Sequence, residues 1–203
     1  MEIIWLGHAC FALESGDYRV VLDPYQLDHY PALHTRGDLV LCSHGHFDHN
    51  NVSAVELRQG RECPFAVETV ETYHDDAQGT KRGMNTMHIL RAEGLTVVHA
   101  GDLGHFPNEA QLAAIRGCDA LLLPVGGYYT IDAPMAKRVA EAAGARVVVP
   151  MHYRHGAFGL REVGPVEEFL KRYDAAEVQM LPGNRFTLTA DSPRGVVVPK
   201  FVI

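Results

Sequence analysis

The sequence predicts an α/β protein in which two β-sheets form the middle layers and helices pack outside them. Short apolar runs bounded by turn residues recur from one end of the chain to the other, as expected of strands. Helical segments are fewer, and they are mixed with strands in the second half of the chain. No linker, repeat or low-complexity tract interrupts the 203 residues, so we predict a single domain over residues 1–203.

The first half of the chain is predicted to consist mainly of strands. They are expected at residues 2–7, 10–16, 18–24, 38–43, 64–73 and twice within 83–102. The first two have the pattern of a hairpin. The run at 38–43 indicates a buried strand that leads directly into a histidine-rich loop.

The second half alternates strands with helices. The apolar runs at 120–125 and 146–152 are typical of strands buried on both faces, and residues 185–190 and 195–203 are the last predicted strands. Helices are predicted at residues 108–117, 132–144 and 164–174, with a short one near Val52. The second of these has Asp132 as its N-cap, Pro134 in its first turn and Gly144 at its end.

The charge and the cysteines restrict the classes of protein to which the chain can belong. A formal net charge of −7 argues against a nucleic-acid partner, which normally requires a basic surface. The four cysteines are widely spaced, which indicates reduced thiols in the cytoplasm. The N-terminal residues lack a cationic region and a long apolar stretch, so we predict neither secretion nor membrane attachment. A small-molecule substrate remains, and a homo-oligomer is left open.

A loop within residues 42–50 contains four side chains that commonly bind metals: His44, His46, Asp48 and His49. His44 and His46 project to the same side, because alternate residues share a face, so they can bind one ion together. Asp48 and His49 turn to the other side and can bind a second ion. The spacing is demanding, and we therefore favour a metal site over an ordinary polar surface loop.

Three further polar residues stand where other predicted strands end: His74, Asp102 and His152. Loops at strand ends commonly carry ligands in α/β folds. His74 would complete the first ion's ligands and His152 those of the second, whereas Asp102 has two oxygens and can bridge both. Each residue also has a local explanation, such as a glycine-flanked turn for Asp102. The four segments support one another and together favour a metal site.

These nitrogen and oxygen donors suit two divalent ions, most simply Zn²⁺, with Mn²⁺ or Fe as alternatives. Two such ions about 3.5–4 Å apart can hold a hydroxide between them and polarise a carbonyl or phosphoryl oxygen. The ions, the two aspartates and the hydroxide leave a charge of about +1, which favours an anionic substrate despite the acidic chain.

The segment "SHGHFDH" resembles the HxHxDH signature of the metallo-β-lactamase fold superfamily. The match continues through His74, Asp102 in "GDLG" and His152. The segments "GHACF", "VVLDP", "PVGGYYTID" and "MHY" are similar to the branch of zinc-dependent hydrolases that includes the ascorbate-phosphate lactonase-like proteins. The resemblance covers nearly the whole chain, but the signature does not specify a substrate.

The resemblance implies an αββα four-layer sandwich of the metallo-β-lactamase type, with two mixed sheets face to face and helices outside. It implies a dinuclear site at one edge between the sheets. His44, His46 and His74 would hold one metal, Asp48, His49 and His152 the other, and Asp102 would bridge them. The redox branch of flavodiiron-type relatives is disfavoured, because those proteins carry glutamate where this chain has His46.

The predicted function is therefore metal-dependent hydrolysis of a small, anionic ester, lactone or phosphoester by a bridging hydroxide. The short chain end after His152 disfavours a glyoxalase-II-like thioesterase, which carries an extra helical region. Two other classes stay open: a mononuclear iron dioxygenase with the same signature, and a non-catalytic metal-binding protein.

Other residues are assigned supporting roles. Asp48 is expected to orient the nucleophile or protonate the leaving group, with His8 and His105 as catalytic partners beside the metals. Tyr128 and Tyr129 are predicted to line the substrate pocket, and Arg154 to meet the substrate's negative charge. Each has a plain structural alternative: a strand-end histidine bonded to backbone, a tyrosine covering the core, an exposed arginine.

Overall fold

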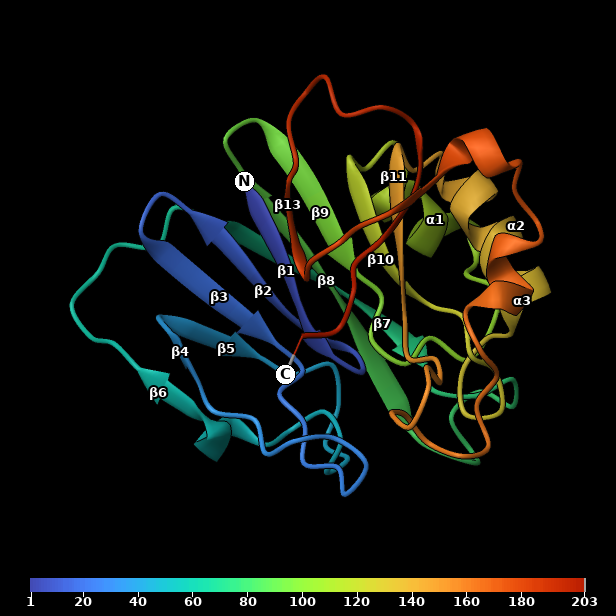
Figure 1. Ribbon diagram of the computed structural model, residues 1–203, viewed down its shortest axis with the longest axis horizontal. Helices are drawn as coiled ribbons and strands as arrows, with labels where there is room; N and C mark the ends of the chain where they lie inside the picture. The colour runs from blue at the N-terminus through green and yellow to red at the C-terminus, as the bar shows by residue number, and fades with distance from the viewer. Residues whose placement is uncertain (203) are drawn as a thin grey trace.

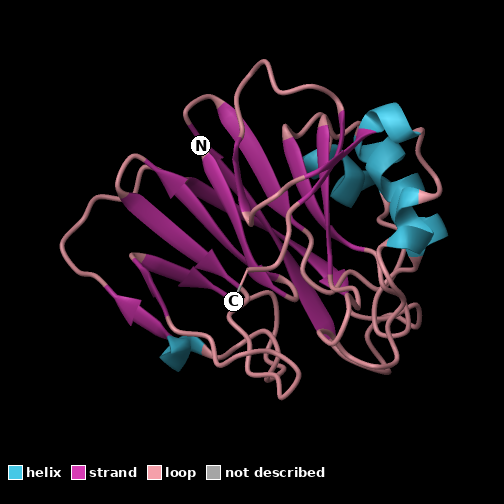
Figure 2. Cartoon of the chain, viewed as in Figure 1, coloured by secondary structure: helices cyan, strands magenta, loops and turns pink. Residues whose placement is uncertain are grey.

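The computed structural model describes residues 1–202, which form two β-sheets that pack face to face (Figures 1 and 2). The first sheet has the strand order β13-β1-β2-β3-β5. Its strands are β1 (Glu2–Gly7), β2 (Cys10–Ser15), β3 (Tyr18–Leu22), β5 (Leu39–Leu41) and β13 (Arg185–Thr187). β1 and β2 form the predicted antiparallel hairpin, whereas β3 and β5 are parallel.

The second sheet has the order β12-β14-β11-β10-β9-β8-β7. Its strands are β7 (Ala66–Tyr73), β8 (Met84–Ala92), β9 (Leu95–His99), β10 (Ala120–Pro124), β11 (Val147–Met151), β12 (Val178–Met180) and β14 (Gly195–Val198). β10 and β11 are parallel to each other and buried along their whole length, as their apolar runs predicted.

The core lies between the two sheets. Residues of β1, β2 and β3 at alternate positions, including Ile3, Trp5, Phe11 and Leu13, pack against the inner face of the seven-stranded sheet. This core joins both sheets and the helices into one hydrophobic cluster. It therefore holds strand ends from both sheets in fixed positions relative to one another.

The α-helices lie on the outer side of the seven-stranded sheet (Figures 1 and 2). They are α1 (Glu109–Ile115), α2 (Ala133–Ala143) and α3 (Glu167–Leu170). The predicted cap of α2 is confirmed, since the Asp132 side chain accepts a hydrogen bond from the Met135 amide and Gly144 ends the helix with φ of 60°. α3 is shorter than the predicted helix at 164–174, which is a correction.

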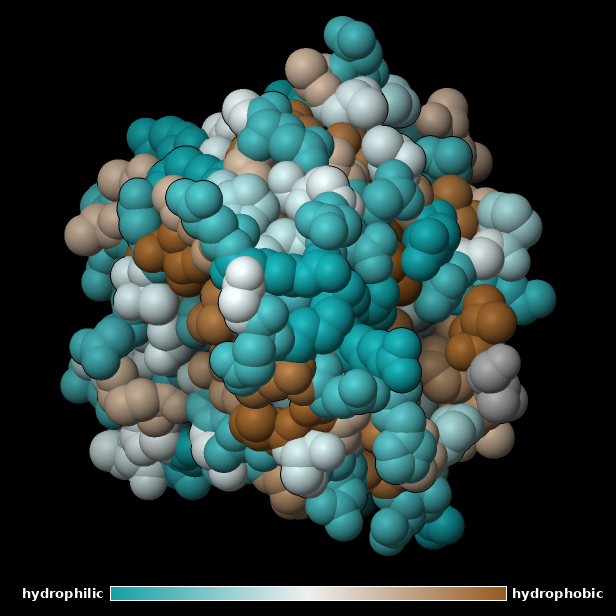
Figure 3. Space-filling view, turned by 90° about the vertical axis from the view of Figure 1, so that its left-hand side faces the viewer, coloured by the Kyte–Doolittle hydropathy of each residue, from teal (hydrophilic) through white to brown (hydrophobic). Residues whose placement is uncertain are grey.

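A different layer covers the outside of the five-stranded sheet. It consists of the loop that contains Tyr25 and Tyr30, the small parallel sheet of β4 (Thr35–Gly37) and β6 (Val55–Leu57), and η1 (Val52–Ala54). The helix predicted near Val52 is thus one 3₁₀ turn. The strand predicted at 38–43 is shorter and only half-buried, because it lies at the sheet edge. Seen from this side, the surface is mostly hydrophilic with small hydrophobic patches (Figure 3).

The predicted α/β sandwich of two mixed sheets with outer helices is confirmed. β4, β6 and β12 are strands that the sequence did not reveal, and each has only three residues. In the described part of the chain, no helix has the length and apolar character needed to span a membrane.

Candidate metal centre

The structure gathers all seven predicted ligands at one end of the sandwich. They come from the loops that follow β5, β7, β9 and β11, as their positions at strand ends predicted. His152 and the neighbouring His8 both have left-handed backbones, with φ of 51° and 52°. Such conformations are costly for residues other than glycine and are often found at functional sites.

The first group of possible ligands contains His44, His46 and His74, each of which offers a ligand atom within 4.8 Å of the others. The ring centroid of His44 lies 4.6 Å from that of His46 and 4.7 Å from that of His74. His74 is buried, His44 is half-buried and His46 is exposed. This group therefore faces solvent through His46.

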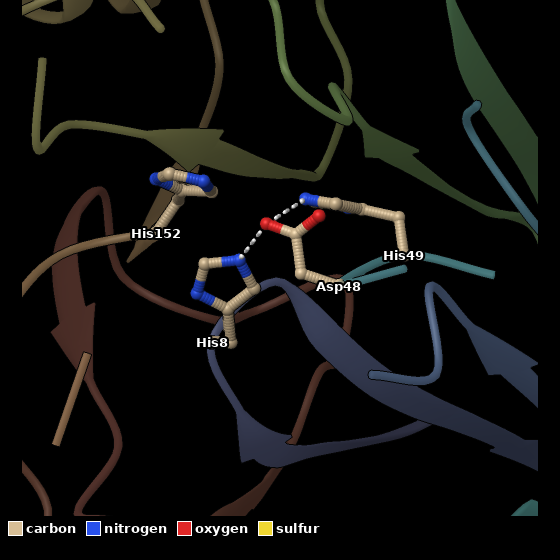
Figure 4. A group of neighbouring side chains, drawn as sticks. All are labelled: His8, Asp48, His49 and His152. Atoms are coloured by element: carbon tan, nitrogen blue, oxygen red, sulfur yellow. Dashed lines mark hydrogen bonds and ion pairs between the residues drawn. The ribbon is translucent and has the colours of Figure 1, made fainter. Parts of the chain in front are cut away.

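The second group contains His8, Asp48, His49 and His152, all of them buried (Figure 4). The Asp48 Oδ2 lies 3.3 Å from the His8 Nε2 and 3.6 Å from the His49 Nε2. The ring of His8 packs on that of His152, with centroids 4.2 Å apart. The geometry adds His8 to the three side chains that the sequence had placed on a second ion.

Asp102 joins the two groups. Its Oδ2 lies 3.3 Å from the Nε2 of His74 and of His152, and its Oδ1 lies 3.3 Å from the Nε2 of His49. Its amide donates a hydrogen bond to Asn85 Oδ1 at 2.8 Å. A carboxylate in this position can contact ions held by either group.

The glycines on either side of Asp102 are required by close packing. A Cβ at Gly101 would lie 2.3 Å from Asn85 Oδ1, and one at Gly104 would lie 2.2 Å from the Asp75 amide nitrogen. Gly101 also has φ of 55°. The turn "GDLG" thus has glycines because Gly101 is pressed against Asn85 and Ser43, and Gly104 against the loop that carries His74.

Asp23, which sequence reasoning did not select, supports both groups. Its Oδ2 accepts hydrogen bonds from His49 Nδ1 at 2.7 Å and from Ser43 Oγ at 2.6 Å. Because the Ser43 hydroxyl donates its own proton to Asp23, its oxygen can accept a hydrogen bond from the Nδ1–H of His44 at 2.9 Å. Both rings then keep the free Nε2 lone pair that a metal requires. The only sequence signal for Asp23 was its place in "VVLDP".

Burial and neighbouring charges shift the pKa values of this centre. Desolvation lowers the pKa of His44 to about 3 and that of His8 to about 4. Burial also opposes protonation of His49, but the carboxylates of Asp102 and Asp23 outweigh it and raise its pKa. Burial disfavours ionised Asp102, yet the adjacent His152 and His49 hold its pKa well below the usual range.

Several buried ligand atoms lack a hydrogen-bond partner among the described residues: His44 Nε2, His49 Nε2, His152 Nε2 and Asp102 Oδ1. Buried polar atoms without partners are costly, and their convergence here is what a metal site requires. Imidazole nitrogens with carboxylate oxygens suit zinc, iron or manganese. The residues present therefore fit bound divalent metal.

Two of the predicted supporting residues lie elsewhere. His105 accepts a hydrogen bond from the Tyr73 amide at Nε2 and donates one from Nδ1 to the Phe106 carbonyl, so both ring nitrogens are occupied. Arg154 is exposed, and its Nε donates to the Val163 carbonyl at 3.4 Å. We therefore assign neither residue to the centre. Tyr128 and Tyr129 line a neighbouring pocket together with Arg82, which sequence reasoning missed.

Comparisons with known proteins show the family to which the chain belongs. A family model described as the beta-lactamase superfamily domain matches residues 2–152. A metal-dependent hydrolase of Methanosphaerula palustris is 29% identical over 214 residues, covering 90% of this chain and 97% of the relative. One from Methanoregula boonei is 32% identical over 185 residues, covering 75% of this chain and 82% of the relative.

A solved structure from Thermotoga maritima is similar over the whole chain. It is described as a candidate Zn-dependent hydrolase of the metallo-β-lactamase superfamily. It is 35% identical in sequence, has a TM-score of 0.78 and covers 99% of both chains.

Proposed function

The chain belongs to the beta-lactamase superfamily and is a metal-dependent hydrolase, and we propose that it acts on small anionic esters, lactones or phosphoesters at a dinuclear centre. The observation that carries this proposal is the pair of ligand groups joined by Asp102. His44, His46 and His74 would hold one ion, and Asp48, His49 and His152 the other. Zn²⁺ is the proposed metal, as described for the Thermotoga maritima protein.

When bound, two divalent ions supply Lewis acidity that polarises a carbonyl or phosphoryl oxygen and lowers the pKa of water. Asp23 and Ser43 orient His49 and His44 for this purpose. Asp102 places negative charge beside both groups, next to His74 of the first and to His49 and His152 of the second.

Asp48 and His8 are the proposed proton-handling pair. The Asp48 Oδ2 contacts the His8 Nε2, and burial keeps the His8 pKa low, so the ring is neutral near pH 7. A neutral imidazole can donate its Nε2 proton to Asp48 and thereby fix the direction of the carboxylate. His8 is thus a positioning residue, and Asp48 is the group closer to the reacting atoms.

The test begins with protein purified without chelator. Elemental analysis should find about two metal ions per chain, and hydrolysis should occur on a panel of esters, lactones and phosphodiesters supplied with zinc, manganese or iron. A His44→Ala/His46→Ala variant should lose metal and activity. A His29→Ala/His34→Ala variant should keep both, since these two histidines are exposed.

The alternatives give different results in the same experiment. One iron per chain with thiol-dependent oxygen uptake would replace the proposal with a dioxygenase. Full metal loading without turnover on any substrate would indicate a non-catalytic metal-binding protein. Unchanged metal content in the His44→Ala/His46→Ala variant would refute the ligand assignment.

A further inference from the structure

A pocket of about 370 Å³ lies beside the metal centre and contains none of the proposed ligands. One wall is the turn at residues 75–82, which begins directly after His74, and the other is the segment at 128–135 after β10. Gly104, two residues beyond Asp102, also lines it. A Cβ on Gly104 would lie 2.2 Å from the Asp75 amide nitrogen and 2.4 Å from the His74 carbonyl carbon, so this wall of the pocket packs against the loop that carries His74. The pocket therefore adjoins the reacting site.

Arg82 is the unpaired cation of this pocket. Its guanidinium lies 5.5 Å from the centre of the Tyr129 ring, and its side chain is half-buried. Within residues 1–202, no carboxylate forms an ion pair with it. Its neighbour Lys81 differs, because the Lys81 Nζ pairs with Asp76 at 2.6 Å.

The carboxylates that line the pocket already have hydrogen-bond partners. Asp75 accepts hydrogen bonds from four backbone amides, those of residues 77, 79, 81 and 82. Asp132 accepts one from the Met135 amide as the N-cap of α2. The pocket is not basic overall, so what it offers an anion is the set of free donors on the guanidinium of Arg82.

Tyr128 forms an apolar face on the same pocket. Its side chain is 65% exposed, and its ring lies edge-on to Tyr129 with centroids 4.7 Å apart. Its backbone has φ of 65°, which costs energy for a side chain of this size. The fold thus holds an aromatic ring in solvent next to a free guanidinium.

We propose that this pocket binds the anionic group of the substrate, with the Arg82 guanidinium paired to its carboxylate or phosphate oxygens and Tyr128 against its apolar part. The planar fork of arginine matches both oxyanions, and the Tyr129 ring limits its movement. The inference rests on the proposed function, because it places the anion of a hydrolysable substrate beside the metal centre. Arg82 thereby takes the role that the sequence had suggested for Arg154.

The test compares two substrates with the same scissile bond, mono-4-nitrophenyl glutarate and its neutral methyl ester, on metal-loaded protein. The wild type should prefer the anionic ester, and Arg82→Gln should reduce that preference in kcat/KM by about tenfold or more. Arg82→Lys should retain part of it, since charge remains without the planar fork. Lys171→Gln is the control and should keep the wild-type preference, because Lys171 does not line the pocket and its Nζ pairs with Glu168 at 2.7 Å.

Calorimetry with benzoate and phenylphosphonate separates this inference from the proposed hydrolysis. Weaker binding of either anion to Arg82→Gln, by about tenfold, supports the pocket even if neither ester is hydrolysed. The anion that binds the wild type more tightly shows whether the pocket prefers a carboxylate or a phosphate-like group. Equal affinity in the wild type and Arg82→Gln, or no binding to the wild type, overturns the proposal. Matching circular dichroism spectra exclude misfolding as the cause of a loss.

Discussion

The two ligand groups of the metal centre are made of similar side chains, but their surroundings differ. His46 of the first group is exposed, whereas all four side chains of the second group are buried. The second group also packs ring on ring, and its Asp48 contacts two histidines. The first group can therefore exchange substrate and water, while the second resembles part of the core. The comparison indicates that metal binding and fold stability are coupled more strongly in the second group.

The largest effect should come from the residue that the two groups share. Asp102→Asn keeps the shape of the side chain but removes the charge that faces His49, His74 and His152. Loss of an orienting outer residue typically costs 10–100-fold, so loss of a shared ligand should cost more than about 100-fold in activity. Metal per chain and kcat/KM measure it. Asp119→Asn, outside the centre, is the control. An active, fully loaded Asp102→Asn protein would mean that the two groups work independently.

The same substitution in each group should separate burial from ligand chemistry. His152→Asn removes a fully buried ring, and asparagine tolerates the left-handed backbone there. In metal-stripped protein it should lower the free energy of unfolding by about 2–4 kcal/mol. His46→Asn, at an exposed position, should change it by less than about 0.5 kcal/mol. Urea unfolding measures both, and equal losses would contradict the difference between the groups.

Asp23→Asn should weaken both groups at once. It removes the carboxylate that orients His49 directly and His44 through Ser43. Metal affinity should fall by about 10–100-fold, which a competition titration with a chelator measures. Asp17→Asn, at an exposed carboxylate, serves as the control. If metal affinity fell only in the group that contains His49, the link from Asp23 through Ser43 to His44 would not affect metal binding.

The last prediction concerns the protonation of His8 in the second group. The folded pKa of His8 is lowered from 6.5 to about 4, so the unfolded chain binds a proton that the folded chain excludes between these values. In metal-stripped protein, stability should fall as the pH drops through this window, by about 1–3 kcal/mol for this residue. His8→Asn should flatten the pH dependence without abolishing it, because His44 also has a lowered pKa. His34→Asn should match the wild type; an unchanged slope in His8→Asn would reject the assignment.

Much of the fold was predictable because its signals are local. The apolar runs of β10 and β11, the hairpin of β1 and β2 and the caps of α2 each depend on residues close together in the chain. β4, β6 and β12 were not predicted, because each has only three residues and, unlike the three-residue strand β5, none lies in a continuous apolar run. Their pairing depends on distant partners instead.

The functional residues also divide into those with a local sequence signal and those whose role depends on distant parts of the chain. His44, His46, Asp48 and His49 were recognisable, because one loop contains all four at demanding spacing. His105 and Arg154 were singled out because they lie near ligands in sequence, but their side chains bond to nearby backbone instead. Arg82 had no sequence signal, since its importance comes from the turn that brings it to Tyr129.

The sequence by itself determined the secondary structure pattern, the kind of ligand and the strand ends at which ligands stand. Those properties follow from side-chain chemistry and local periodicity. Only the tertiary structure decided that Asp23 orients both groups and that His8 belongs with the second, whereas the bridging position of Asp102 was already predicted from the sequence. These relations join residues far apart in the chain, and their distances are set by the packing of the two sheets on one core.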